Sequence, residues 1–343
     1  MYALRALLLK RRNTKLQIKN SISQLKALII ASALTAILAF LCIFIGDICA
    51  PFAAAFYAVL LLIESPGKRV FSYAIPAISI VADILLNGLS GYGCIQFTVI
   101  GILIAVAFTR RFRKSTLAAM ISAVFILFTL WGLCCTAFQA TEVYTLESVK
   151  EFYFDLLDKV KVEMVDVLTK VPISVTKEGT NVYLTSTDAT TMVNAVFSLL
   201  VSFVAIIAFF LSGLSIKTFT RLATRLSADE DEVRSWMFIT TSVFAYAYLG
   251  VFVINLFSAG MGEIASAVIA NLYAILMVVY AYLGMKLLVG FILNSPRRGL
   301  FLAGLILIVI SMNFYALIPL SLFGTYGVIV TNRHLGAIDG GDE

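Results

Sequence analysis

The stretch that decides the fold runs from Ala27 to Ile45 and reads ALIIASALTAILAFLCIFI. It carries no charge, and about 20 residues of α-helix are enough to cross the hydrocarbon core of a bilayer, which is ~30 Å thick. The residues before it include seven Lys and Arg and no Asp or Glu. Because basic residues beside a span favour the cytoplasmic side, we expect a first transmembrane helix with the N-terminus in the cytoplasm.

The composition of the whole chain extends this expectation. Of its 343 residues, 61% are hydrophobic and 13% are charged, against about 25% charged residues in soluble domains. The apolar runs are continuous rather than alternating, which favours helices over a membrane β-barrel. We therefore expect an all-α, polytopic transmembrane helical bundle of eight or nine spans in a bacterial plasma membrane. Basic residues cluster beside the spans without interleaved aromatics, so the expected partner is the lipid bilayer and not nucleic acid.

Flanking charges and turn residues divide the chain into five predicted parts. These are a basic cytoplasmic or interfacial N-terminus (1–26), a six-helix membrane domain (27–216), a cytoplasmic linker helix (217–236), a three-helix membrane block (237–323) and a polar tail (324–343). The sixth span is expected from Met192 to Leu214. The second run, Pro51 to Ile63, has 13 residues, and whether it fully crosses the bilayer stays open, as does the side of the C-terminus.

An insertion at 140–190 precedes the sixth span and has a different character. It contains nine acidic and five basic residues, which suits the outer face of the membrane. From Val149 to Val171 apolar residues recur at helical spacing, which predicts an extracellular amphipathic helix. This helix would either lie on the membrane or cap the outer mouth of the bundle. The residues after Pro172 predict a small hairpin.

Four polar residues within or near the spans form the candidate ligand-binding site. Asp83 is the only acid well inside an apolar run, about one turn from its outer end, and Asn87 follows on the same helical face. A charge in hydrocarbon is costly unless it is paired or hydrated, so such a residue is a functional candidate, with simple hydration as the alternative. Gln96 and Asn194 are expected at the same depth. Together the four side chains predict a site for a small polar ligand beneath the Gly-rich loop 88–93.

Motifs for catalysis or metal binding do not occur in the sequence. The only histidine is His334, and there is no HExxH, GxSxG, CxxC or P-loop pattern. The five cysteines lack the spacing of metal ligands. We therefore expect neither an enzyme nor a bound metal or cofactor.

The first span also carries a ladder of small residues, at Ala27, Ala31, Thr35 and Ala39. Small residues at every fourth position lie on one face of a helix, and such a face lets another helix approach closely. The ladder either packs inside this chain or docks a separate membrane subunit.

The layout of the chain resembles two related families. Six spans with both ends inside, the small-residue ladder and the Gly-rich outer loop resemble the S component of energy-coupling-factor (ECF) vitamin transporters. The longer chain resembles the YybS-like bacterial membrane family, through its outer insertion and a further three-helix block that ends in Pro319, Gly324, Thr325, Tyr326, Gly327 and Arg333.

The resemblance implies a role in transport. In S components the first helix docks on a transmembrane coupling subunit that works with ATPases, and substrate binds near the outer helix ends. The resemblance therefore implies docking through Ala27, Ala31, Thr35 and Ala39 and ligand binding at the level of Asp83. We expect a subunit that captures a small polar or lipid-derived ligand from outside. The alternative is a non-transporting scaffold that recruits envelope-assembly or division partners.

Overall fold

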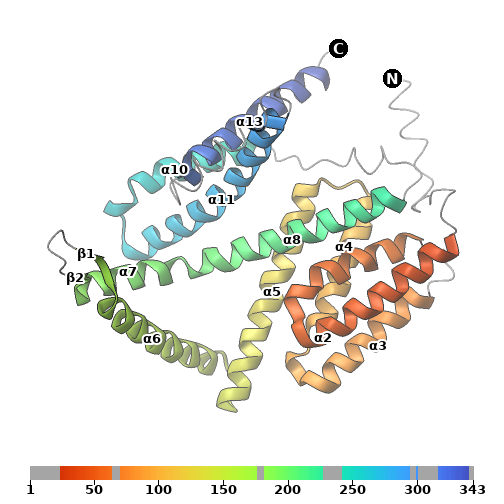
Figure 1. Cartoon of the computed structure of the whole chain (residues 1–343), viewed down its shortest axis with the longest axis horizontal. Coiled ribbons are helices and arrows are strands. Elements are labelled where there is room, and N and C mark those ends of the chain that lie inside the picture. The colour runs from red at the N-terminus through yellow and green to blue at the C-terminus, as the bar shows by residue number, and fades with distance from the viewer. Residues whose placement is uncertain are drawn as a thin grey trace. The chain divides into compact units, whose positions relative to one another are not determined.

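The computed structural model describes residues 24–63, 70–175, 181–226, 242–293, 299 and 316–339. Apart from one short hairpin, these residues are mostly helical (Figure 1). They fall into two compact units: unit 1 is Met1–Leu157 with Ile207–Phe238, and unit 2 is Asp158–Ile206 with Ile239–Glu343. The expected all-α class is confirmed, whereas the domain boundaries inferred from the sequence stay predictions.

Some predicted segments lie outside the described residues. They are the basic N-terminus up to residue 23, the linker helix after Leu226 and, within the predicted three-helix block, residues 237–241, 294–298 and 300–315.

Unit 1 begins with α2 (Gln24–Ile63), which consists of two arms joined at Gly46. Gly46 has φ 32° and ψ −110°, a conformation that is strained for residues with a Cβ, so glycine permits the reversal. The second arm, Ile48–Ile63, has Pro51 in its first turn, where backbone N–H groups have no helical partner. The chain thus forms a second apolar helix from the short predicted run.

The remaining helices of unit 1 pack around α2. They are α3 (Val70–Asn87), the turn η2 (Gly88–Ser90), α4 (Gly93–Thr109), α5 (Lys114–Thr141) and the part of α8 (Leu200–Leu226) after Ile207. α4 contacts both arms of α2: the thiol of Cys94 donates to the Ala39 carbonyl at 3.5 Å, and Phe97 lies edge-to-face on Tyr57. The core is built from alanines, isoleucines and a few phenylalanines of these helices.

The helix α6 (Leu146–Lys170) and the strands β1 (Pro172–Val175) and β2 (Asn181–Tyr183) follow α5. The two strands pair antiparallel, with Val175 opposite Asn181. They lie where the sequence predicts a hairpin, directly after the amphipathic helix. The boundary between the two units falls within α6, between Leu157 and Asp158.

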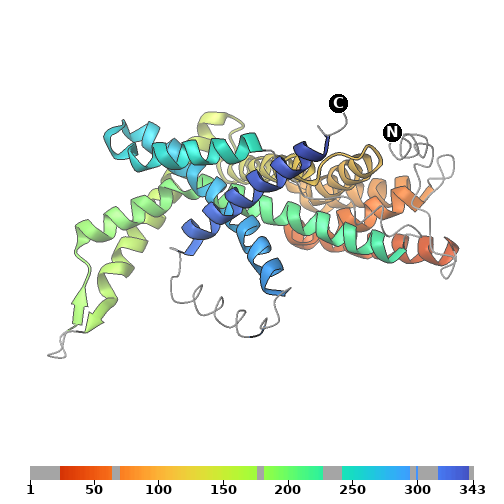
Figure 2. The same cartoon turned by 90° about the horizontal axis from the view of Figure 1, so that it is seen from above.

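Unit 2 contains α7 (Ser186–Ser198), the first turns of α8, α10 (Ser242–Leu256), η3 (Ser258–Gly260), α11 (Glu263–Leu293) and α13 (Leu317–Asp339). α11 and α13 lie against each other in both views (Figures 1 and 2). Their backbones come so close that a Cβ on Gly284 would clash with the carbonyl of Leu320, and one on Gly324 with the carbonyl of Tyr280.

Two boundaries differ from the sequence-based prediction. The sixth span begins at Leu200 rather than Met192, because α7 ends at Ser198 and Leu199 separates it from α8. The segment from 324 onward, predicted as a polar tail, continues α13 as far as Asp339. The small residues that look like the start of a tail are the ones that pack: Thr325 is buried, and Gly324 lies against the backbone of α11.

Five described helices are long and apolar enough to cross a membrane: Gln24–Gly46, Val70–Asn87, Lys114–Thr141, Leu200–Leu226 and Ile264–Leu293. Four shorter apolar helices accompany them: Ile48–Ile63, Gly93–Thr109, Ser242–Leu256 and Leu317–Asn332. This is a helical membrane protein, and the total of eight or nine spans stays a prediction.

Candidate functional site

Asp83 is the centre of a polar cluster at one end of unit 1. Its side chain is only 1% exposed. One carboxylate oxygen, Oδ2, accepts a hydrogen bond from the backbone N–H of Cys94 at 2.9 Å, and the other, Oδ1, accepts one from Asn87 Nδ2 at 2.9 Å. Neither the predicted hydration nor a bound ligand is needed to satisfy these two oxygens.

The bond to Cys94 explains why a carboxylate lies there. Cys94 is the second residue of α4, whose first N–H groups lack helical partners and carry partial positive charge. The residue at the usual capping position, Tyr92, makes no side-chain cap. Asp83 therefore caps α4 from the neighbouring helix α3.

Asn87 ties the same cluster to α2. Its Nδ2 also donates to the carbonyl of Ile43 at 2.8 Å, in the last turn before the break at Gly46. Such carbonyls have lost their helical partners and need another donor. The Asp83 cluster, which comprises Asp83, Asn87 and Cys94, thus joins the ends of three helical segments.

Gln96 lies two residues after Cys94 and is fully buried, with 0% exposure. Residues two apart on a helix project from different sides, so the side chains of Cys94 and Gln96 point in different directions. Among the described residues, neither Gln96 Oε1 nor Gln96 Nε2 has a hydrogen-bond partner. Each buried polar group without a partner costs about 1–3 kcal/mol, which makes this amide the least satisfied large polar group of α4.

Asn194 is not on the helix where the sequence places it. It belongs to α7 rather than to the sixth span, is exposed and is part of unit 2. Of the four predicted ligand residues, the structure brings Asp83 and Asn87 into contact, and it places Gln96 on another side of α4.

The predicted docking ladder is covered. Ala27, Ala31, Thr35 and Ala39 are each at most 3% exposed, and the three alanines belong to the core of unit 1. The hydroxyl of Thr35 donates to the carbonyl of Ala31. The close approach that small residues allow is therefore used within this chain, and docking of a separate subunit through Ala27, Ala31, Thr35 and Ala39 stays a prediction.

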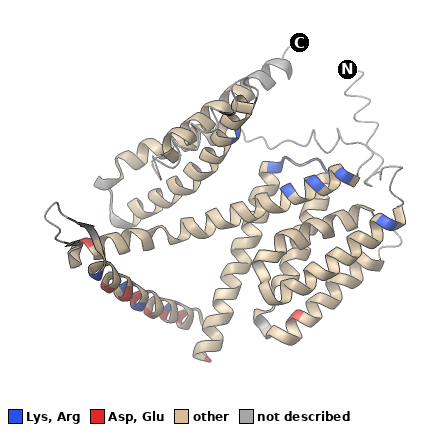
Figure 3. Cartoon of the chain, viewed as in Figure 1, with Lys and Arg blue, Asp and Glu red and all other residues tan. Residues whose placement is uncertain are grey.

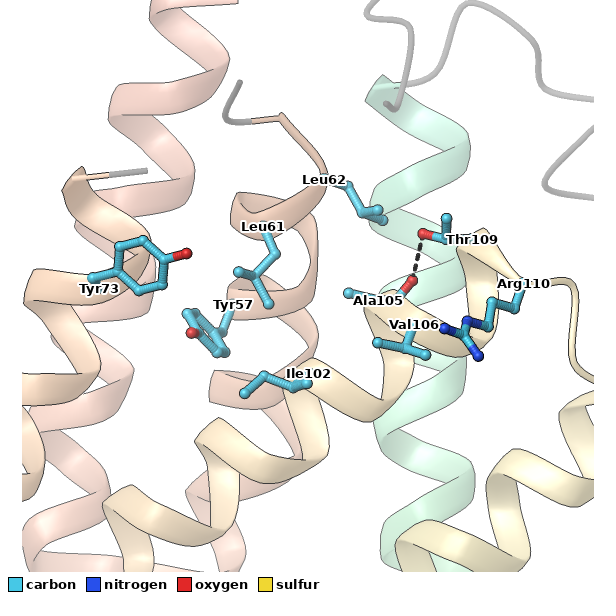
Figure 4. A pocket seen from close by; sticks show the side chains of 9 residues that line it. All are labelled: Tyr57, Leu61, Leu62, Tyr73, Ile102, Ala105, Val106, Thr109 and Arg110. Atoms are coloured by element: carbon cyan, nitrogen blue, oxygen red, sulfur yellow. Dashed lines mark hydrogen bonds between the residues drawn. The ribbon is translucent and has the colours of Figure 1, made fainter. Parts of the chain in front are cut away.

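Sequence reasoning did not identify a groove at the other end of unit 1. It encloses about 450 Å³ between α3, α4 and the second arm of α2 (Figure 4). Its lining consists of the apolar Leu61, Leu62, Ile102, Ala105 and Val106 and the polar Tyr57, Tyr73, Thr109 and Arg110. The sequence shows Arg110 only as one of several cations at a span end, because the groove depends on how three helices diverge.

Charges separate along unit 1. Lys and Arg gather around the start of α2, the connection between α4 and α5 and the end of α8 (Figure 3). Asp83, near the end of α3, and Glu142, directly after α5, lie at the ends of these helices away from those cations. The groove is therefore at the cation-rich end and the Asp83 cluster is at the acidic end.

The helix α6 presents apolar side chains on its surface. Leu156, Met164 and Val167, which share one face of the helix, are 44%, 37% and 58% exposed. On its inner side, the hydroxyl of Tyr153 donates to the carbonyl of Leu133 at 2.9 Å. Burial raises the pKa of Tyr153 above its ordinary value, which further favours the protonated phenol that donates this bond. The first turns of α6 are thereby fixed to α5 while an apolar surface stays uncovered.

Comparisons with protein-family models, with curated proteins and with solved structures give no match for this chain.

Proposed function

We propose that this membrane protein is a solute-binding subunit, similar to an ECF S component, that binds a small polar or lipid-derived ligand at the acidic end of unit 1. The observation that carries the proposal is the buried, unpartnered amide of Gln96. An amide offers one acceptor and two donors, which suits a ligand with both kinds of group. A ligand or an ordered water would remove the cost of leaving these atoms unpaired.

The charge separation supports an orientation for this site. Cation-rich ends favour the cytoplasm, so the end with Asp83 and Gln96 would face outward and the N-terminus would be cytoplasmic, in a bacterial plasma membrane. The Asp83 cluster would hold the helix ends around the ligand rather than touch it, because its carboxylate oxygens already accept bonds from Cys94 and Asn87.

Active transport by this protein would need partners. The sequence has no P-loop, so we propose that a transmembrane coupling subunit with ATPases supplies the energy and that this chain binds rather than converts its ligand. Since the small-residue ladder is covered, such a partner would contact other apolar residues of the first helix, such as Ile29, Ile37 and Phe44, which are exposed.

Native mass spectrometry of the full chain tests the ligand site through Gln96→Leu. The substitution replaces the amide by an apolar group of similar size, and we expect loss of any co-purified small molecule with unchanged or slightly higher thermal stability. Gln139→Leu is the matched control, because Gln139 is an exposed amide at the acidic end of α5. A bound small molecule that survives Gln96→Leu, or loss that is equal in both variants, would contradict the site.

The second candidate function is a non-transporting scaffold for envelope-assembly or division proteins. The exposed apolar side chains of α6 favour it, since large apolar surfaces outside a core commonly mark interaction sites. Cross-linking in cells and native mass spectrometry together distinguish the two functions. For a scaffold we expect proteins cross-linked to α6 and no small molecule bound at Gln96.

A further inference from the structure

The groove at the cation-rich end of unit 1 is open on one side. Tyr73 of α3 and Ile102 and Val106 of α4 form its rim and are 65%, 44% and 41% exposed. Tyr57 and Leu62 of α2 are buried beneath them. Figure 4 shows Tyr73 on one side and Ile102 and Val106 on the other, with Tyr57 and Leu61 between.

The surroundings of this groove are expected to be lipid. Its rim residues lie on helices that are apolar along most of their length, and the bilayer covers the outward faces of such helices. An apolar groove in hydrocarbon keeps dispersion contacts only if apolar groups fill it. A lipid acyl chain is the apolar group that is always present there.

One end of the groove is cationic. Within the described part of the chain, no hydrogen bond or ion pair is found for the exposed Arg110 guanidinium. The hydroxyl of Thr109 beside it donates to the carbonyl of Ala105 at 2.7 Å (Figure 4). The hydrogen bond of this hydroxyl is therefore made within α4 and not with the guanidinium. Arg111, Arg113 and Lys114 follow in the sequence and add positive potential at the headgroup level.

An elongated apolar groove that ends in a guanidinium matches one ligand chemistry. The planar fork of arginine binds two phosphate oxygens at once, and the tyrosine rings and aliphatic side chains of the lining offer apolar contact to an acyl chain. Tyr57 is held in place, since its hydroxyl donates to the carbonyl of Ser72 at 3.0 Å. The groove wall is thus formed before any ligand arrives.

We propose that this groove binds an anionic glycerophospholipid from the leaflet at the cation-rich end, with its phosphate at Arg110 and an acyl chain along Tyr57, Ile102 and Val106. This lipid site is at the opposite end of unit 1 from Gln96 and does not depend on the proposed solute binding. The phosphate of an anionic lipid complements the charge of Arg110, and a helix of another protein or a second copy of this chain is the contrary outcome of the test below.

The test is native mass spectrometry of the full chain, delipidated in detergent and titrated with phosphatidylglycerol or phosphatidylcholine. We expect one tightly bound phosphatidylglycerol per chain and weaker binding of phosphatidylcholine. Arg110→Gln weakens phosphatidylglycerol binding about tenfold, the loss expected for a charged hydrogen bond. Arg225→Gln is the matched control, because Arg225 is an exposed cation at the same end of unit 1, in the last turn of α8.

A second variant separates groove filling from charge. Ile102→Trp enlarges an exposed rim residue and should displace the acyl chain while Arg110 is intact, again lowering the affinity for phosphatidylglycerol. The proposal is overturned if Arg110→Gln binds like Arg225→Gln, if both lipids bind equally, or if Ile102→Trp binds like the unmodified chain. A protein partner or a dimer seated at Tyr73, detected by cross-linking, would also overturn it.

Discussion

At the scale of single residues, Asp83 shows how a membrane-embedded carboxylate can serve structure. It accepts hydrogen bonds from the start of α4 and from Asn87, and Asn87 continues the chain of bonds to α2. A buried carboxylate in this position stabilises the positive end of a helix that has no cap of its own.

We expect Asp83→Ala to destabilise unit 1 by about 2–3 kcal/mol, because it leaves the N–H of Cys94 and the amide of Asn87 without this acceptor. Asp83→Asn keeps one acceptor and should cost less. Thermal unfolding in detergent, followed by a conformational probe, measures both. Equal stability of Asp83→Ala and the unmodified chain would show that the cap does not contribute.

Part of this cluster could be predicted from the sequence. Asp83 and Asn87 are four residues apart, so their contact on one helical face follows from helix geometry alone. The bond to Cys94 could not be predicted, because it requires knowing that η2 brings the start of α4 back to α3. The burial of Gln96 could not be predicted either, because it depends on which helices pack around α4.

At the scale of elements, glycine decides how closely α11 and α13 pack. Gly284 and Gly324 face each other's helix backbones with no room for a side chain. Close backbone contact of this kind is a main source of helix association in membranes, where the hydrophobic effect between helices is weak.

Gly284→Ala should therefore weaken the α11–α13 contact, by about 1–3 kcal/mol or more, because the added Cβ forces the helices apart. Gly290→Ala on the same helix is the control, since a Cβ at Gly290 meets no atom within 4 Å and alanine favours the helix. Limited proteolysis and thermal unfolding in detergent report the difference. If the two variants unfold alike, the close packing is not as described.

The elements themselves were largely predictable. Continuous apolar runs predicted the membrane helices, and the gap between the runs Ala27 to Ile45 and Pro51 to Ile63 predicted the break between the arms of α2. The helix that continues after residue 324 was not predictable, because glycine, serine and threonine are typical both of tails and of close helix contacts. Likewise, the sixth span starts later than the apolar run, since α7 ends at Ser198 before α8 begins.

At the scale of the whole molecule, unit 1 is asymmetric in its charges. Cations mark the end with the lipid groove, and Asp83 and Glu142 mark the other end. The sequence predicts this polarity through the positive-inside bias, because charge beside a span is visible without any tertiary structure. The groove and the covered ladder depend on long-range packing and therefore were not predictable.

Labelling in intact cells with a membrane-impermeant maleimide tests the central claim of this orientation most directly. Tyr144→Cys and Phe112→Cys place new thiols at exposed positions after α5 and after α4, at opposite ends of unit 1; the unmodified chain gives the background. We expect Tyr144→Cys to react from outside and Phe112→Cys to react only after the membrane is permeabilised. The reverse pattern, or equal labelling from outside, would contradict it.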